Sequence, residues 1–159
     1  MATDGQRWLV LVGFLAVTFG VSAVGGIFTS MGMPDWYMGL EKPAFNPPSW
    51  VFGPVWTILY AMMAVAAWLV WRASGFQGAR PALAMFFVQL ALNLAWSGIF
   101  FGLQAPGWAL VEIIILWAAI LVTMILFFRH STVAGWLMAP YLLWVTFAAV
   151  LNGAIWWLN

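Results

Sequence analysis

The fold is decided by the segment from Trp36 to Tyr60, WYMGLEKPAFNPPSWVFGPVWTILY, which combines prolines, aromatic residues and a few charges between long apolar runs. The Pro47-Pro48 pair excludes a regular helix at that point, because proline lacks the backbone donor and restricts the residue before it. Ser49 is a suitable helix N-cap, and Pro54 lies close enough to a helix start to be tolerated. The segment is therefore predicted to be an ordered loop that turns into a helix near Ser49.

The composition predicts an integral membrane protein. Of the 159 residues, 66% are hydrophobic and 6% are charged, whereas soluble domains carry about 25% charged residues. The net charge of +1, without any basic run, argues against a nucleic-acid partner. The sequence contains no cysteine, which excludes disulfides and thiol chemistry. His130 has no Cys, His or carboxylate at ligand spacing, so neither a metal site nor a required cofactor is expected.

Five apolar runs are each long enough to cross the hydrocarbon of a bilayer, which takes about 20 residues. They predict an all-α protein whose five transmembrane helices form a single domain over residues 1–159. The expected helices cover residues 7–28, 49–72, 81–103, 107–129 and 133–158. In the first run a cleaved signal peptide is the alternative, because Val21-Ser22-Ala23 resembles a cleavage site. The run nevertheless continues to Phe28, which favours a membrane span.

The basic residues predict the orientation. Arg7, Arg72, Arg80 and Arg129 fall on the N-terminal side of the membrane, and Lys42 falls on the other side. Cytoplasmic loops carry the excess of Lys and Arg. In a bacterial cell envelope, the N-terminus would therefore be cytoplasmic if the protein lies in the inner membrane.

Polar and aromatic side chains gather in the loop-side half of the predicted bundle. With a rise of about 1.5 Å per residue, Trp56 lies about 10 Å below the loop surface. Asn93 and Trp96 fall in the loop-side half of the third helix, and Trp144 lies near the middle of the fifth. The proline-rich loop is expected to cap these residues. This arrangement predicts a pocket that is apolar with a few polar groups and suits a flat hydrophobic ligand.

Two of the polar signals leave alternatives open. Gln89 and Asn93 share a helix face at i, i+4, so they either line the pocket or join helices by hydrogen bonds. Glu112 is costly in hydrocarbon, but near the interface it can extend toward water or accept a bond, and ligand contact is the alternative.

A stripe of small residues on the third helix is a candidate homodimer face, because close helix approach needs small side chains. It consists of Ala91, Ala95, Gly98 and Gly102. Packing against another helix of the same chain is the alternative. A second stripe on the first helix competes for the dimer role: Gly13, Ala16, Gly20 and Ala23.

The chain resembles the TspO/translocator protein family, also called tryptophan-rich sensory proteins or peripheral-type benzodiazepine receptors. The resemblance runs through nearly the whole chain. The matching segments are Trp36-Tyr37, Gly39-Leu40, Lys42-Pro43, Pro47-Pro48, Gly53-Pro54-Val55-Trp56, Gln89 to Asn93, Gly107 to Val111 and Pro140-Tyr141-Leu142 with Trp144. It implies a homodimer that binds porphyrins such as protoporphyrin IX, and drug-like hydrophobic ligands, under the first loop.

The resemblance also implies which residues contact the ligand. The matching positions are Tyr37, Pro47, Trp56, Tyr60, Asn93, Trp96, Trp144 and Ala148. The expected function is that of a membrane receptor, sensor or carrier for porphyrins in tetrapyrrole or stress handling. Some bacterial members promote light- and oxygen-dependent breakdown of protoporphyrin, and in that alternative Trp56 and Trp144 are the catalytic residues. A small-molecule transporter is a further alternative, although Glu112 is the one charged candidate within the helices for ion coupling.

The sequence departs from the family pattern at two places. Phe45 stands where the family often has Trp, and Asn46 follows it. Animal members carry a Tyr and a basic residue in a proposed cholesterol motif, where this chain has Gly153 and Trp157. That motif is weak evidence even when intact, and its absence argues against sterol binding by that route.

Overall fold

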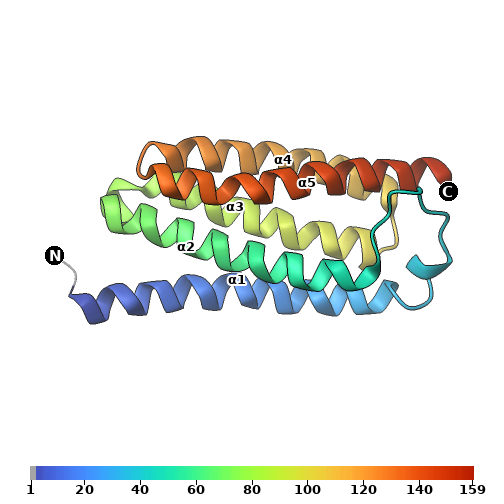
Figure 1. Ribbon diagram of the computed structural model, residues 1–159, viewed down its shortest axis with the longest axis horizontal. Helices are drawn as coiled ribbons and strands as arrows, with labels where there is room; N and C mark the ends of the chain where they lie inside the picture. Colours follow the sequence, from blue (N-terminus) through green and yellow to red (C-terminus); the bar gives the residue numbers. More distant parts are fainter. Residues whose placement is uncertain (1–2) are drawn as a thin grey trace.

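The structure is a computed structural model that describes residues 3–159, and it consists of five long helices (Figure 1). The helices are α1 (Asp4–Gly32), α2 (Phe52–Gly78), α3 (Arg80–Ser97), α4 (Pro106–Phe128) and α5 (Thr132–Leu158). All five belong to segments that are long and apolar enough to cross a membrane, and residues 3–159 contain no strand. In hydrocarbon, a helix satisfies its backbone donors and acceptors within itself. The prediction of an all-α protein with five spans is confirmed.

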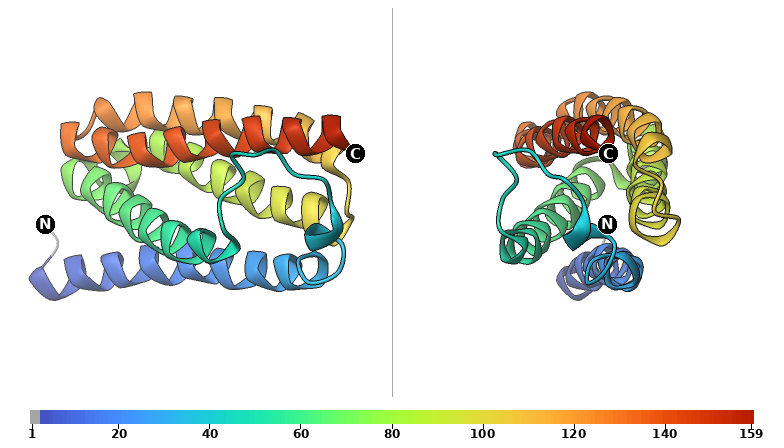
Figure 2. Two further views of the ribbon diagram at one scale, coloured as in Figure 1. Left: turned by 45° about the vertical axis from the view of Figure 1, so that its right-hand side comes forward. Right: turned by 90° about the vertical axis from the view of Figure 1, so that its right-hand side faces the viewer.

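The helices form a ring whose order differs from the order of the sequence. Going around the bundle, α1 contacts α2, α2 contacts α5, α5 contacts α4, α4 contacts α3, and α3 returns to α1. The end view in Figure 2 shows α1 at one side of the ring and α4 and α5 at the other. Because α2 packs on α5, residues of the second and last helices face each other across the interior.

The loop between α1 and α2 is ordered and contains two single 3₁₀ turns, η1 (Tyr37–Gly39) and η2 (Ser49–Val51). The chain is not helical through Pro47-Pro48, as predicted, and α2 begins directly after η2. The expected cap is wrong, however. Ser49 starts the 3₁₀ turn itself, Pro48 precedes it, and no side chain caps either η2 or α2.

The second helix is longer than the sequence indicated. The helix predicted for residues 49–72 continues in the structure to Gly78. Arg72 stays on the helix with its guanidinium 4.7 Å from the ring centroid of Trp68, a cation–π arrangement. The break comes at Gly75, whose φ of 71° is a conformation that glycine adopts without steric cost.

The third span ends in a π-helical segment, η3 (Gly98–Gly102). The backbone N–H of Leu103 donates to the carbonyl of Gly98 at 2.8 Å, which is the i to i+5 pattern of a π-helix. The segment packs closely on the end of α1. A Cβ added at Gly32 would lie 2.7 Å from the carbonyl oxygen of Phe101, so glycine is required there for the two backbones to meet.

Candidate ligand-binding site

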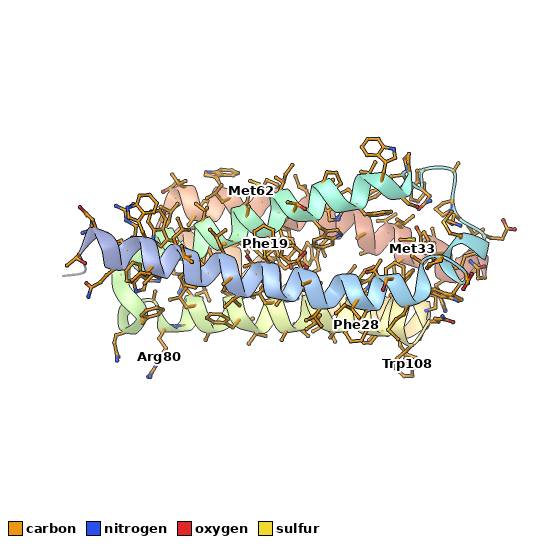
Figure 3. The ribbon with its side chains drawn as sticks, turned by 90° about the horizontal axis from the view of Figure 1, so that it is seen from below. Phe19, Phe28, Met33, Met62, Arg80 and Trp108 are labelled. Atoms are coloured by element: carbon orange, nitrogen blue, oxygen red, sulfur yellow. The ribbon has the colours of Figure 1, made fainter. Side chains whose placement is uncertain are left out.

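A cavity of about 530 Å³ lies inside the loop-side half of the bundle. All five helices contribute to its wall, together with η3 and Tyr37 from the loop. Its size falls within the range of about 300–1,000 Å³ typical of ligand pockets. Figure 3 shows the bundle from the α1 side, with Met33 marking the loop end and Phe28 lying between α1 and α3. The predicted pocket is therefore present as a cavity in the expected half of the molecule.

A chain of hydrogen bonds crosses the interior beside the cavity. The hydroxyl of Tyr60 on α2 donates to Asn93 Oδ1 on α3 at 2.6 Å, and Asn93 Nδ2 donates to the hydroxyl of Tyr141 on α5 at 2.8 Å. Tyr141 in turn donates to Gln89 Oε1 at 2.7 Å. Tyr60 and Asn93 line the cavity, whereas Gln89 and Tyr141 are not part of its wall. The two alternatives for Gln89 and Asn93 thus apply together: both join helices, and Asn93 also faces the cavity.

Trp96 is held in the cavity wall by a second network. Its Nε1 donates to Asn152 Oδ1 at 2.9 Å, and Asn152 Nδ2 donates to the carbonyl of Pro106 at 2.8 Å. The indole also stacks on Phe100 of η3, with ring centroids 4.9 Å apart. The N–H of Trp96 is therefore already paired, so this residue offers a ligand its aromatic surface.

The two other tryptophans of the predicted site, Trp56 and Trp144, also line the cavity. Trp56 lies 5.5 Å from Tyr60 and 6.2 Å from Tyr141 between ring centroids. Trp144 packs edge-on against Phe52 at 6.0 Å. Its Nε1 is buried and has no hydrogen-bond partner among residues 3–159. Trp144 is therefore an indole of the site whose N–H is both buried and unpaired among the described residues.

The loop covers the end of the cavity. Tyr37 is buried, and its hydroxyl donates to Asn46 Oδ1 at 3.0 Å. Burial raises the pKa of this phenol above its ordinary value of 10.0, and the bond to Asn46 lowers it in part. The ammonium of Lys42 lies 5.1 Å over the Tyr37 ring. Asn159 at the end of α5 exchanges two hydrogen bonds with the backbone of Glu41, so the loop is attached to the last helix.

The structure brings together seven of the eight predicted ligand residues. Around the cavity lie Tyr37, Trp56, Tyr60, Asn93, Trp96, Trp144 and Ala148. Pro47 is half-buried in the loop and is not part of the cavity wall. Asn152, which orients Trp96, was not among the predicted residues. Sequence reasoning also missed the contribution of α1, whose Ser22, Gly25, Gly26, Thr29 and Ser30 line one side.

Glu112 lies on the buried side of α4, outside the cavity wall. Its side chain is 8% exposed, and neither carboxylate oxygen has a hydrogen-bond partner within the described chain. It therefore neither reaches toward water nor accepts a bond from residues 3–159. The described residues also hold no cluster of three His, Cys, Asp or Glu that could bind a metal ion.

The predicted dimer stripe divides into two parts. Gly98 and Gly102 face Phe28 of α1, since a Cβ added at either position would lie 3.7 Å or 3.2 Å from that ring. Ala91 and Ala95, farther from the loop, are exposed. The two glycines thus pack within the chain, which was the alternative, and the alanines are left on the outer surface. The homodimer itself stays a prediction.

Comparison with known proteins agrees with this architecture. The profile of the TspO/MBR family matches residues 14–158. The chain is 42% identical over 151 residues to a tryptophan-rich protein TspO of Archaeoglobus fulgidus, covering 95% of this chain and 97% of the relative. It is 40% identical over 152 residues to the human translocator protein, covering 94% and 89%, respectively.

A third relative is the tryptophan-rich sensory protein of Cereibacter sphaeroides, which is 39% identical over 146 residues. That alignment covers 91% of this chain and 88% of the relative. The family profile and the three relatives each extend over most of the five-helix bundle and its capping loop. The chain is therefore an integral, multi-pass membrane protein that belongs to the TspO/MBR family.

Proposed function

We propose that the cavity binds protoporphyrin IX or a similar flat, largely apolar molecule, and that the protein acts as a membrane receptor, sensor or carrier in tetrapyrrole or stress handling. The observation that carries this proposal is the aromatic lining of one cavity by Trp56, Trp96 and Trp144. Leaving a buried donor unpaired costs about 1–3 kcal/mol. The N–H of Trp144 carries such a cost, and a ligand with a carbonyl or carboxylate acceptor would recover it if binding turned the indole so that its N–H faced the cavity.

The remaining wall supports an aromatic, planar ligand. The rings of Trp56, Trp96 and Tyr60 border the cavity, and the hydroxyl of Tyr60 and the N–H of Trp96 are both used in bonds within the protein. The site therefore offers mainly apolar surface with few free polar groups, as ligand pockets do. The names of two relatives, a sensory protein and a translocator protein, agree with a role in ligand detection or handling.

Titration of protoporphyrin IX into the purified protein in the dark, followed by tryptophan fluorescence, tests the proposal. We expect saturable quenching for the wild type and weaker binding for Trp144→Phe, which keeps a ring but loses the donor. Trp136→Phe is the matched control, because Trp136 is exposed and lies outside the cavity wall. Absence of saturable binding by the wild type would contradict the porphyrin proposal.

Photo-oxidative degradation of the bound porphyrin is the second candidate function, favoured by the presence of Trp56 and Trp144 in the wall of one cavity. An indole beside a photo-excited porphyrin can donate an electron or react with singlet oxygen. Illumination of the complex in the presence of oxygen would then change the porphyrin spectrum. Trp56→Phe or Trp144→Phe should stop that change at ligand concentrations that still saturate the site.

We propose the orientation from the position of the charges. Four arginines belong to the end of the bundle opposite the loop, either in the terminal turns of helices or directly beside them: Arg7, Arg72, Arg80 and Arg129. In a bacterial inner membrane, that end would be cytoplasmic. Single cysteines placed at Ser131 and at Glu41 should react with an impermeant thiol reagent from opposite sides of the membrane, because the natural chain has no cysteine.

We also propose that two copies associate through the exposed part of the α3 stripe. Ala91 and Ala95 present small side chains on the outer surface, where two helices can approach closely. Ala95→Trp should shift the protein toward the monomer in light-scattering measurements in detergent. Val122→Trp, a change at an exposed position on α4, should leave the association unchanged.

A further inference from the structure

The loop closes the cavity at the end of the bundle by several contacts. Tyr37 is buried and bonded to Asn46, Lys42 lies over the Tyr37 ring, and Asn159 holds the backbone of Glu41 on both its N–H and its carbonyl. A ligand that entered from water at this end would have to displace this segment. The loop therefore separates the cavity from water at this end of the bundle.

The side of the cavity between α1 and α2 is different. The two helices are joined in the middle of the bundle by Phe19 and Tyr60, whose rings lie 6.4 Å apart. Farther from the loop they are joined again by the stacked rings of Trp8 and Trp68, 5.5 Å apart. Within residues 3–159, no hydrogen bond or aromatic pair joins α1 to α2 on the loop side of Phe19 and Tyr60.

Nearer to the loop, the facing positions on α1 and α2 are glycines and not aromatic residues. Gly26 lies seven residues after Phe19 on α1, and Gly53 lies seven residues before Tyr60 on α2. Residues seven apart share a helix face. Gly26 and Gly53 therefore lie on the faces by which α1 and α2 meet at Phe19 and Tyr60, nearer to the loop. Both line the cavity, both are exposed, and a Cβ added at either would meet no atom within 4 Å. The cavity therefore opens to the surface between the two helices.

The rim of this opening is compatible with hydrocarbon. The hydroxyls of its polar residues donate hydrogen bonds to backbone carbonyls of their own helices. Thr29 donates to the carbonyl of Gly25 at 2.9 Å, and Thr57 donates to the carbonyl of Gly53 at 2.8 Å. Ser30 likewise donates to a carbonyl of α1, at 2.7 Å. No hydroxyl of this rim needs water, and an unsatisfied polar group is what lipid penalises.

The depth of the opening places its inner part, at Gly26, within the hydrocarbon and its outer part, at Ser30, level with the headgroups. With a rise of 1.5 Å per residue, the 29 residues of α1 extend about 43 Å, whereas the hydrocarbon core is about 30 Å thick. If α1 is centred, roughly 6 Å projects at each end. Gly26 lies about 9 Å from the last residue of α1 and thus just within the hydrocarbon.

We infer that ligands enter the cavity sideways from the bilayer, through the opening framed by Gly26 and Ser30 on α1 and by Gly53 and Thr57 on α2. The occupants this route selects are molecules dissolved in the loop-side leaflet: largely apolar and thin enough to pass between two helices. The loop then serves to keep water out of the occupied cavity. This route applies to any membrane-dissolved ligand and does not require that the ligand be a porphyrin.

Labelling of a single cysteine inside the cavity tests the route without any porphyrin. Ala148→Cys places the one thiol of the chain in the cavity wall, and Ser97→Cys provides a second position. In proteoliposomes, each variant is treated with an uncharged, lipid-soluble maleimide and with a sulfonated, water-soluble one. We expect the lipid-soluble reagent to label the cavity much faster than the sulfonated reagent.

Closing the opening provides the matched comparison. Gly26→Phe adds a ring where the structure has open space at the rim, and it should reduce labelling by the lipid-soluble reagent several-fold. Gly20→Phe adds the same ring on α1 at an exposed position outside the cavity wall, also with open space around it, and should leave the rate unchanged. Equal labelling by both reagents, or an unchanged rate in Gly26→Phe at both cysteine positions, would overturn the inference. The inference would also be overturned if the lipid-soluble reagent labelled the cavity cysteine only after denaturation.

Discussion

The hydroxyl of Tyr60 donates a hydrogen bond of 2.6 Å to Oδ1 of Asn93, and this bond joins α2 to α3 at the wall of the cavity. Both residues are buried, with 5% and 4% of their surface exposed, so water does not replace either partner. The bond therefore contributes to the stability of the bundle as well as to the shape of the site.

Tyr60→Phe is expected to lower the free energy of unfolding by about 1–3 kcal/mol, because it leaves a buried acceptor on Asn93 unpaired. Thermal unfolding in detergent, followed by near-UV circular dichroism, would measure the loss. Asn93→Leu and the double variant complete a double-mutant cycle. If the two single losses simply add, the bond has no coupling energy, and the assignment of its role is wrong.

Gly32→Ala should destabilise the packing of α1 on η3, since the added Cβ would lie 2.7 Å from the carbonyl oxygen of Phe101. Overpacking of this kind costs about 1–3 kcal/mol. Gly20→Ala is the control, because its Cβ meets nothing within 4 Å and alanine favours a helix by about 1 kcal/mol. Melting temperatures of the two variants should therefore move in opposite directions, and a shift of both in the same direction would contradict this account.

Trp96→Phe and Trp144→Phe should differ although both remove an indole from the cavity wall. The Trp96→Phe change removes the hydrogen bond of 2.9 Å from the indole and leaves the side-chain oxygen of Asn152 without its donor. The unliganded variant should therefore be less stable by about 1–3 kcal/mol. The Trp144→Phe change removes no hydrogen bond within the described chain and should lower the stability less. Thermal shift assays without ligand would separate the two, and equal losses would show that the unpaired donor is not a feature of the protein in solution.

We expect the contact of Tyr37 that attaches the loop to be lost in strong base. Its pKa is raised above 10.0 mainly by burial, so the folded protein holds the phenolic proton more tightly than the unfolded chain does. The stabilisation is complete below pH 10 and is lost as the pH rises through the raised pKa. Hydrogen exchange of the 37–46 segment, measured with increasing pH, should accelerate in that range. Tyr37→Phe should exchange independently of this transition, and identical profiles for the two proteins would contradict the assignment.

Asn159→Ala should loosen the loop without affecting the cavity wall. The amide of Asn159 both accepts from and donates to the backbone of Glu41, and the loop loses both bonds in the variant. Limited proteolysis near Glu41 should become faster. A protease-resistant loop in the variant would show that the contacts of Tyr37 alone hold it closed.

The spans were predictable because their apolar runs leave the backbone no alternative in a membrane, and the loop was predictable because Pro47-Pro48 forbids helix. The extension of α2 to Gly78 was not predictable in the same way. Arg72 and the glycines are typical of a turn, and the helical dihedrals do break at Gly75, but the backbone is helical again up to Gly78. The sequence does not show whether a glycine ends a helix or only interrupts it, because that depends on the conformation of the residues that follow.

The candidate site was predictable where residue type and depth together were informative. Polar and aromatic residues far from the interface, such as Asn93 and Trp144, are expected either to line a pocket or to join helices, and Asn93 does both. The contribution of α1 was missed because its glycines, serines and threonines are equally typical of helix packing. Which small face points to a cavity depends on how the helix is rotated, and a stripe such as Gly98 and Gly102 shows the difficulty, since both glycines pack on Phe28.

The order of the helices around the ring affects how this protein is made. The chain is inserted into the membrane from its N-terminus, yet α2 packs against α5, and the cavity wall needs Trp144 and Ala148 from that last helix. The loop, synthesised early, finds its second attachment only when Asn159 appears. During synthesis, α1 and α2 therefore enter the bilayer before the cavity wall is complete, and the wall is finished only when α5 has been inserted.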